Sequence, residues 1–271
     1  MDINYYWSGD KDGRRRFAQE HTIDMAKNAS AEIHKSVNYT KIYSPNDIIT
    51  FDAPKVDKVN IHLEAYGTVD AIYEYAQGKT AALNFASYKE PGGRFIDGSR
   101  AQEECLCAES DLYNVLRQFQ SYYDWNNEHK NLALYTNRAL YSPNILFDRP
   151  NLGEDRYMLC DIITCAAPNI APSRKYGWGI TDKQNSAALR SRIDFVLAIA
   201  AEQKVNTLIL GAYGCGVFGQ DATEVATIFM QLLTSKYRGC FDTIVFAIPQ
   251  DVHGGNYDKF KKVLDNWRKK R

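Results

Sequence analysis

Short apolar segments alternate with longer amphipathic segments along most of this chain, and this alternation restricts the fold more than any other feature. Strands are expected at residues 38–44, 58–65, 81–86, 157–164, 207–210 and 241–248. Helices are expected at residues 14–28, 102–119, 182–203, 221–236 and 256–268. Strands that alternate with helices of this length predict an α/β fold, with helices packed on both faces of a central sheet.

Two glycine-rich loops follow predicted strands, and both are candidates for a binding site. In α/β sheets, ligands bind beyond the carboxyl ends of the strands, in the strand-to-helix loops. The first loop covers residues 87–101 and the second covers residues 211–220.

The first loop combines glycines with a pair of carboxylates. Gly92 and Gly93 allow backbone N–H groups to approach an anion without obstruction from a Cβ atom. Glu103 and Glu104 then open the predicted helix. Acidic residues at a helix start are favoured by the helix dipole alone. The second explanation is a general acid and base at the mouth of an anion-binding loop.

The second loop is dominated by Gly211, Gly214, Gly216 and Gly219. Backbone amides and the start of the next helix would suit a phosphate, whereas tight-turn packing is the alternative explanation. The loop matches neither the dinucleotide-binding fingerprint nor the P-loop. Phe218 either anchors the loop in the core or offers a ring to a ribose or base. Together, the two loops suit a nucleotide diphosphate with an acid beside its sugar.

The six cysteines do not have the spacing of metal ligands. Cys105 and Cys107 are expected to be free, buried thiols in a reducing compartment. Cys215 could be a nucleophile, but no histidine lies near it in the sequence to act as its base. A small packing residue is the favoured interpretation. We expect no metal and no other cofactor.

Charge and hydropathy exclude several classes of protein. The chain has 33 Lys and Arg residues against 33 Asp and Glu residues, a balance that argues against general nucleic-acid binding. The basic clusters at residues 14–16 and 268–271 are expected to be solvated surface. No apolar run is long enough to cross a membrane, and the N-terminus has no signal-peptide pattern. A cytoplasmic protein with no membrane contact is expected.

Several motifs of the chain resemble those of the microbial-type poly(ADP-ribose) glycohydrolases. The family signature is a glycine loop followed closely by Gln-Glu-Glu, and it is similar to Pro91-Gly92-Gly93 followed by Gln102-Glu103-Glu104. Similar segments also occur at residues 83–87, 105–107, 141–143, 164–169 and 210–218 and in the first helix. The resemblance covers roughly residues 12–250, in order.

The resemblance implies a single macrodomain-like catalytic domain over residues 1–271, with an N-terminal helical extension over about residues 1–35. The implied fold is a mixed central sheet flanked by helices. The implied activity is hydrolysis of ribose–ribose O-glycosidic bonds in poly(ADP-ribose), releasing ADP-ribose from chain ends. The implied partners are ADP-ribose or the polymer on modified proteins, and a monomer is expected.

The same resemblance assigns roles to individual residues. Glu104 matches the catalytic acid, which protonates the departing ribose oxygen and then activates water. Glu103 matches the neighbour that positions the ribose. Contacts with ADP-ribose are implied for Asn84, Gly92, Gly93, Gln102, Gly214, Cys215, Gly216, Val217 and Phe218, the last at the distal ribose.

One position departs from the family pattern, because Arg94 replaces the third glycine of the first loop. If that position has a positive φ, arginine costs roughly 1–2 kcal/mol of strain. Its side chain would crowd the cleft, point outward or clamp a phosphate. The alternatives to a glycohydrolase are therefore a binding module with little turnover, a hydrolase of another ADP-ribosyl linkage, and, most distantly, a non-nucleotide α/β protein.

Overall fold

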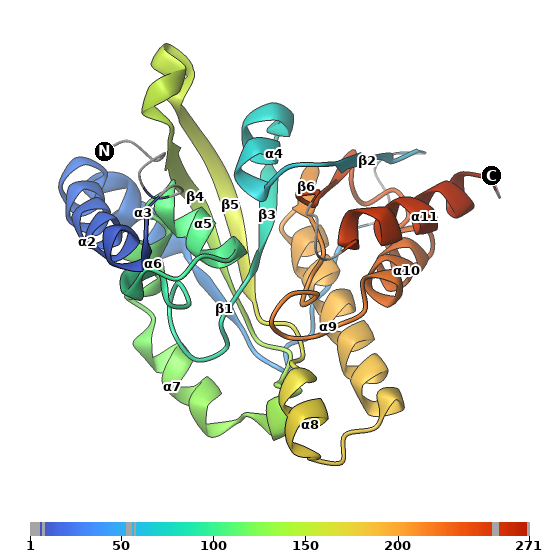
Figure 1. Cartoon of the computed structure of the whole chain (residues 1–271). Helices are drawn as coiled ribbons and strands as arrows, with labels where there is room; N and C mark the ends of the chain where they lie inside the picture. Colours follow the sequence, from blue (N-terminus) through green and yellow to red (C-terminus); the bar gives the residue numbers. More distant parts are fainter. Residues whose placement is uncertain (1–5, 7–8, 53–55, 57, 251–254, 270–271) are drawn as a thin grey trace.

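A seven-stranded mixed sheet forms the centre of the molecule in the computed structural model, which describes residues 6, 9–52, 56, 58–250 and 255–269 (Figure 1). The strand order is β1-β4-β5-β3-β6-β7-β2. The strands are β1 (Lys41–Tyr43), β2 (Asn60–Glu64), β3 (Thr80–Phe85), β4 (Ala139–Asp148), β5 (Tyr157–Cys165), β6 (Thr207–Leu210) and β7 (Thr243–Ala247). This mixed sheet with flanking helices confirms the predicted fold class.

Strands β5, β3, β6, β7 and β2 are parallel, whereas at one edge β4 pairs antiparallel with β5 and β1 pairs antiparallel with β4. The carboxyl ends of the parallel strands therefore lie along the same side of the sheet, which we call the carboxyl edge of the sheet. Strand β3 is central and buried on both faces, so successive residues alternate between two cores. Leu83 packs into the core on one face, and Ala82 packs into the core on the other.

Helices cover both faces of the sheet (Figure 1). On one face lie α9 (Asp182–Glu202), α10 (Ala222–Leu233) and α11 (Asn256–Arg268). On the other lie α2 (Lys11–Asn28), α3 (Ser30–Tyr39), α4 (Thr68–Tyr75), α5 (Gln102–Ala108), α6 (Leu112–Leu116) and α7 (Gln120–Glu128). The short helix α8 (Ala171–Tyr176) lies beyond the carboxyl end of β5. Every helix in the described ranges is too short or too polar to span a lipid bilayer.

Helix α2 is attached to the loop that leads into α5. The side chain of Arg14 donates to the carbonyl of Gly98 at 2.8 Å, and Phe17 packs in the same buried cluster as Phe95. Asn114 of α6 donates to the carbonyl of Thr22 at 2.9 Å. The N-terminal helix therefore supports the outer side of the first glycine loop.

The prediction of a single helix over residues 102–119 is wrong, because the helix is interrupted between α5 and α6. Ser110 forms an isolated antiparallel bridge with Phe147. The N–H of Asp111 donates to the carbonyl of Leu146 at 3.1 Å, and its side chain accepts from the N–H of Leu146 at 3.1 Å. Pairing with β4 thus replaces the helical hydrogen bonds, and apolar periodicity carries no sign of it.

The strand expected over residues 38–44 begins later, since residues up to Tyr39 belong to α3. The expected strands at 58–65, 81–86, 157–164, 207–210 and 241–248 correspond to β2, β3, β5, β6 and β7. Of the basic C-terminal cluster, Arg268 and Lys269 are exposed, and residues 270–271 lie outside the described residues.

Arg192 of α9 is almost fully buried and joins segments that flank the carboxyl end of β5. Its guanidinium donates to the side-chain oxygen of Asn137 at 2.9 Å, to the carbonyl of Leu134 at 3.3 Å and to the carbonyl of Ala166. We expect Arg192→Met to lower the free energy of unfolding by about 3 kcal/mol, because it leaves buried acceptors without a donor. Urea denaturation measures this loss.

Arg190→Met is the matched control, because Arg190 lies on the same helix but is exposed and donates to Gln231. Its effect should stay within about 0.5 kcal/mol. Equal losses for the two variants would contradict the role assigned to Arg192.

Candidate active site

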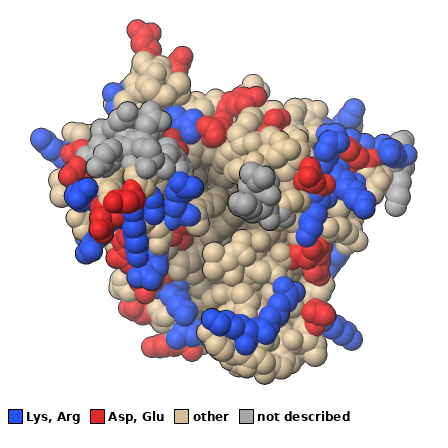
Figure 2. Space-filling model, viewed as in Figure 1, with Lys and Arg blue, Asp and Glu red and all other residues tan. Residues whose placement is uncertain are grey.

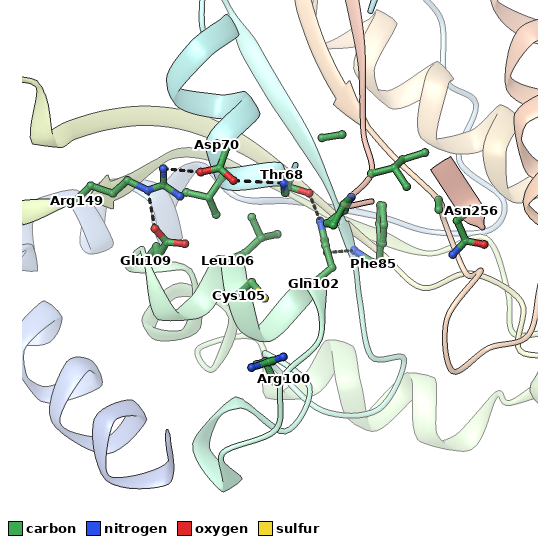
Figure 3. A pocket seen from close by; sticks show the side chains of 16 residues that line it. Thr68, Asp70, Phe85, Arg100, Gln102, Cys105, Leu106, Glu109, Arg149 and Asn256 are labelled. Atoms are coloured by element: carbon green, nitrogen blue, oxygen red, sulfur yellow. Dashed lines mark hydrogen bonds and ion pairs between the residues drawn. The ribbon is translucent and has the colours of Figure 1, made fainter. Parts of the chain in front are cut away.

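Gln102 fastens the start of α5 to the end of β3. Its side-chain oxygen accepts from the N–H of Phe85 at 2.8 Å, and its side-chain nitrogen donates to the carbonyl of Leu83 at 2.9 Å. The same nitrogen donates to the hydroxyl of Thr68 at 3.1 Å, so α4 joins the arrangement (Figure 3). The carboxylates that follow Gln102 are therefore placed directly against the central strand.

Glu103 is buried at this edge and accepts hydrogen bonds from three groups. The side-chain nitrogen of Asn84 donates to Oε1 at 3.1 Å, and the N–H of Ser87 donates to Oε2 at 2.6 Å. The N–H of Gly92 also donates to this carboxyl group. These donors favour the charged form, but burial outweighs them and raises the pKa of Glu103 to about 8.

Glu104 is held by backbone donors from both sides of the loop. The N–H of Arg94 donates to Oε1 at 3.0 Å, and the N–H of Ala101 donates to Oε2 at 3.0 Å. Its side chain is 7% exposed, and that of Glu103 is 3% exposed. The first turn of α5 thus presents two adjacent carboxyl groups in fixed positions.

Gly93 makes this arrangement possible because its backbone lies against both carboxyl groups. Its φ is +61°, a conformation that L side chains rarely adopt. A Cβ atom here would lie 2.7 Å from Oε1 of Glu104 and 3.0 Å from Oε2 of Glu103. Gly92 has a φ of +66°, and a Cβ there would lie 2.7 Å from the ring of Tyr113.

Arg94 adopts a φ of −114°, so the strain considered for a positive φ is absent. Its side chain points outward and forms an ion pair with Asp97 at 3.0 Å. Of the three possibilities for this side chain, outward orientation is the one observed. The backbone N–H of Arg94, which any residue but proline supplies, is its contact with Glu104.

The second loop runs from β6 to α10 and closes over tight turns. Asp221 caps α10 by accepting from the N–H groups of Thr223 at 2.9 Å and Glu224 at 3.0 Å. Gly214 has a φ of +74°, and a Cβ there would lie 2.8 Å from Ala167. The side chain of Val217 is 83% exposed, and Gly216 has open space around its Cα atom.

Phe218 belongs to a small aromatic cluster beside this loop. It packs against Tyr88, Ala133, Tyr135 and Ala166, with its ring centroid 6.1 Å from that of Tyr135. Tyr88 belongs to the first loop, which follows β3, so this cluster connects the two loops. The rings of Phe85 and Tyr213 make a second connection, with centroids 5.7 Å apart. The ring of Phe218 is half-buried, so it can anchor the loop and still present a surface.

The sequence-predicted residues therefore form two neighbouring groups. Asn84, Gly92, Gly93, Gln102, Glu103 and Glu104 gather at the end of β3, and Gly214, Cys215, Gly216, Val217 and Phe218 lie in the second loop. In this structure Gln102 contacts β3 and α4, and its described polar contacts make it a structural fastener.

The cysteines contribute no obvious reactive group. Burial raises the pKa of the Cys215 thiol to about 12, which keeps it protonated at neutral pH. Cys107 and Cys160 are fully buried, and burial raises the pKa of each thiol. The described residues contain no cluster of His, Cys, Asp and Glu that could hold a metal ion.

A cavity of about 520 Å³ opens beside Gln102 (Figure 3), and neither Glu103 nor Glu104 lines it. Its walls include Thr68, Phe85, Gln102, Ala212, Ile248 and Asn256. At its far end, Arg149 pairs with Glu109 at 2.6 Å and with Asp70 at 2.8 Å. Apart from Gln102, the cavity contains none of the sequence-predicted residues. Sequence analysis missed this cavity because it depends on the parallel pairing of β2 with β7, which brings together two strands that lie far apart in the chain.

Comparisons with family models and with solved structures relate this chain to one family of proteins. A family model described as the catalytic domain of microbial-type PARG matches residues 11–149. The crystal structure of poly(ADP-ribose) glycohydrolase from Thermomonospora curvata is similar, with 29% identity and a TM-score of 0.81 over 93% of this chain and 99% of that one. A second structure of that protein contains the inhibitor ADP-HPD and has 29% identity and a TM-score of 0.80, with coverage of 93% and 99%.

The poly(ADP-ribose) glycohydrolase from Deinococcus radiodurans in complex with ADP-ribose is also similar. It has 30% identity and a TM-score of 0.76, over 87% of this chain and 98% of that one. Among curated protein sequences, no significant match was found.

The raised pKa of Glu103 predicts a pH-dependent stability. Between about pH 4.5 and pH 8 the folded chain keeps the proton that the unfolded chain releases, so stability falls as pH rises through this window. Glu103→Gln cannot titrate. The variant should therefore become more stable relative to the wild type at each step from pH 5 to pH 8. Denaturant unfolding at several pH values measures the difference.

Glu154→Gln, which changes an exposed carboxylate, is the control and should show a constant difference from the wild type. A constant difference for Glu103→Gln as well would show that Glu103 is already ionised in the folded protein.

Proposed function

The chain belongs to the microbial-type poly(ADP-ribose) glycohydrolase family and hydrolyses ribose–ribose bonds in poly(ADP-ribose), and from this premise we propose that Glu104 is its general acid and base. The observation that supports this role is the position of its carboxyl group. It lies at the carboxyl end of the central strand, held by the N–H groups of Arg94 and Ala101, with Gly93 leaving the approach open.

In the proposed reaction, Glu104 protonates the ribose oxygen that leaves the scissile bond. Positive charge then develops at the anomeric carbon of the bound ribose. The carboxylate formed on Glu104 takes a proton from water, which attacks that carbon and restores the acid. One carboxyl group acts in both steps, so its position must be fixed throughout, which the two backbone N–H donors achieve.

We assign the positioning of the reacting ribose to Glu103 and Asn84. A carboxyl group with a pKa near 8 is neutral at physiological pH, and a neutral carboxyl can donate a hydrogen bond to a hydroxyl group. The side-chain oxygen of Asn84 is buried and has no hydrogen-bond partner among the described residues. We assign this unpaired acceptor to a hydroxyl group of the bound ribose.

The diphosphate is assigned to the second loop, next to the capped start of α10. The backbone of Gly214, Cys215, Gly216 and Val217 is the expected contact, because glycine-rich turns let backbone N–H groups approach an anion closely, whereas the N–H groups of Thr223 and Glu224 at the start of α10 already donate to Asp221. Phe218 would pack against the distal ribose. Contacts of this kind come from the backbone, so they depend on the glycines more than on side-chain chemistry.

The adenosine end is assigned to the cavity beside Phe85 and Gln102. Ala212 of the second loop forms part of its wall, so a diphosphate on that loop continues directly into it. A volume of about 520 Å³ is within the usual range for a small-molecule site. In this arrangement the nucleotide spans the edge of the sheet, with its distal ribose at Glu104.

A binding module with little turnover was considered because Arg94 replaces a glycine. The structure removes that argument, because Arg94 neither strains the loop nor fills the cleft. A hydrolase of another ADP-ribosyl linkage would use the same loops, and a substrate panel separates the two. We further propose that residues 1–271 act as one catalytic domain, as a cytoplasmic monomer on modified proteins. The free thiols of Cys105, Cys107, Cys160, Cys165 and Cys215 support the compartment.

Replacing the proposed acid gives the most direct test. Glu104→Gln should lower the release of ADP-ribose from purified polymer by about a thousandfold, because the amide cannot transfer the proton. Initial rates of ADP-ribose release measure this. Glu90→Gln, which changes an exposed carboxylate of the same loop, is the matched control and should retain activity. Equal rates for wild type and Glu104→Gln would refute the assignment.

Arg94→Gly tests whether the departure from the family pattern matters. The φ of −114° is open to any residue, and the ion pair with Asp97 is exposed. We therefore expect an unchanged kcat and a loss of stability below about 1 kcal/mol. Steady-state kinetics and thermal unfolding measure the two quantities. A large rise in kcat would show that Arg94 restrains the reaction.

A further inference from the structure

An exposed basic and aromatic surface lies beside the second loop and takes no part in the site described above. It consists of Arg174, Lys175, Tyr176 and Trp178, and we refer to it as the α8 face. Tyr176 is 62% exposed and Trp178 is 44% exposed, both large values for aromatic side chains. Figure 2 shows Lys and Arg atoms gathered over the place that α8 occupies in Figure 1.

The α8 face is fastened to the loop that carries Phe218. The N–H groups of Ile170 and Ala171 donate to the carbonyl of Phe218 at 3.0 and 3.3 Å. Arg174 donates to the carbonyl of Gly219 at 2.6 Å. The face therefore continues directly from the end of the site at which the distal ribose is proposed to lie.

The two aromatic side chains of this face are exposed and lie next to each other. Trp178 stands between Gly177, with a φ of +66°, and Gly179, with a φ of +75°. The rings of Tyr176 and Trp178 are stacked at a centroid distance of 6.2 Å and an interplanar angle of 26°. Such exposed, roughly parallel rings suit a flat base, because every base has a face that stacks on an aromatic ring.

The charge of the surrounding segments is one-sided, although the whole chain is neutral. Residues 169–181 contain Arg174 and Lys175 and no acidic residue, and residues 211–220 contain no charged residue. The adjoining segment 129–137 contains Lys130 and no acidic residue, whereas Arg138 is buried and Glu128 and Asp221 border these segments. Asp182 is the first carboxylate beyond the face. A diphosphate would meet cations here and little repulsion.

Resting on the proposed function, we propose that the α8 face binds the part of poly(ADP-ribose) that lies beyond the scissile bond. The leaving unit is attached to the distal ribose, and from there it passes the Phe218 loop and reaches α8. An adenine of the leaving chain stacks on Tyr176 and Trp178, and a diphosphate pairs with Arg174 and Lys175. The enzyme thus reads more of the polymer than the ADP-ribose unit that it releases.

Two substrates separate this surface from the catalytic site. Long poly(ADP-ribose) can contact the α8 face, whereas an aryl glycoside of ADP-ribose has a phenol in place of the leaving nucleotide and cannot reach it. The test variants are Trp178→Ala and Lys175→Ala, neither of which changes a residue bonded to the second loop. Tyr157→Ala is the matched control, because Tyr157 is 57% exposed beside Arg156 at the opposite end of β5.

For the double variant Lys175→Ala and Trp178→Ala, kcat/KM on long polymer should fall about tenfold, since a base stack and a phosphate contact are both lost. Hydrolysis of the aryl glycoside should stay at the wild-type rate, which also shows that the variant is folded. The salt dependence of KM for polymer should become weaker in Lys175→Ala. Tyr157→Ala should match the wild type on both substrates.

Each of the other outcomes is decisive. If the wild type cleaves both substrates and the double variant loses nothing on polymer, or loses equally on both, the α8 face is not a polymer subsite. If the wild type cleaves neither substrate, the proposed function itself fails. If a single-stranded adenine oligonucleotide inhibits polymer cleavage as strongly as an equal concentration of uncleaved polymer does, the face is a nucleic-acid surface and the assignment is overturned.

Discussion

The burial of two adjacent carboxyl groups at the end of the central strand is the constraint on which this site depends. Removing such groups from water is costly unless donors replace the lost hydration. Glu103 obtains these donors from Asn84, Ser87 and Gly92, and Glu104 obtains them from Arg94 and Ala101. The first glycine loop must therefore fold around the carboxyl groups, because its own N–H groups are the donors that make their burial tolerable.

This constraint also separates the tasks of two neighbouring residues of the same type. Glu103 faces the strand, where burial raises its pKa to about 8 and keeps it neutral. Glu104 is held between the two arms of the loop. A single turn of helix thus gives two neighbouring carboxyl groups different surroundings. Both positions require glycine at residue 93, since a Cβ atom there would collide with both carboxyl groups.

The α8 face is proposed to extend substrate binding from a single nucleotide to a longer part of the polymer. A neutral chain avoids indiscriminate attraction to nucleic acid, while a local excess of Arg174 and Lys175 beside the Phe218 loop can still attract diphosphates. Hydrogen bonds from Ile170, Ala171 and Arg174 attach this face to the carbonyl groups of Phe218 and Gly219, so the face and the second loop are held at a fixed distance from each other.

Sequence alone determined the five parallel strands, the long helices that cover them, the two glycine loops and the carboxylate pair, because hydrophobic period and glycine content are local properties. It did not predict the antiparallel strand β4 or the short helices α4, α7 and α8. It missed the break at Ser110, since pairing with β4 depends on a strand more than thirty residues away. It left the conformation of Arg94 open, and the tertiary structure fixed it by aiming the N–H of that residue at Glu104. The pKa of Glu103 and the cavity beside Gln102 were likewise decided in three dimensions, because burial depends on which segments meet at the edge of the sheet.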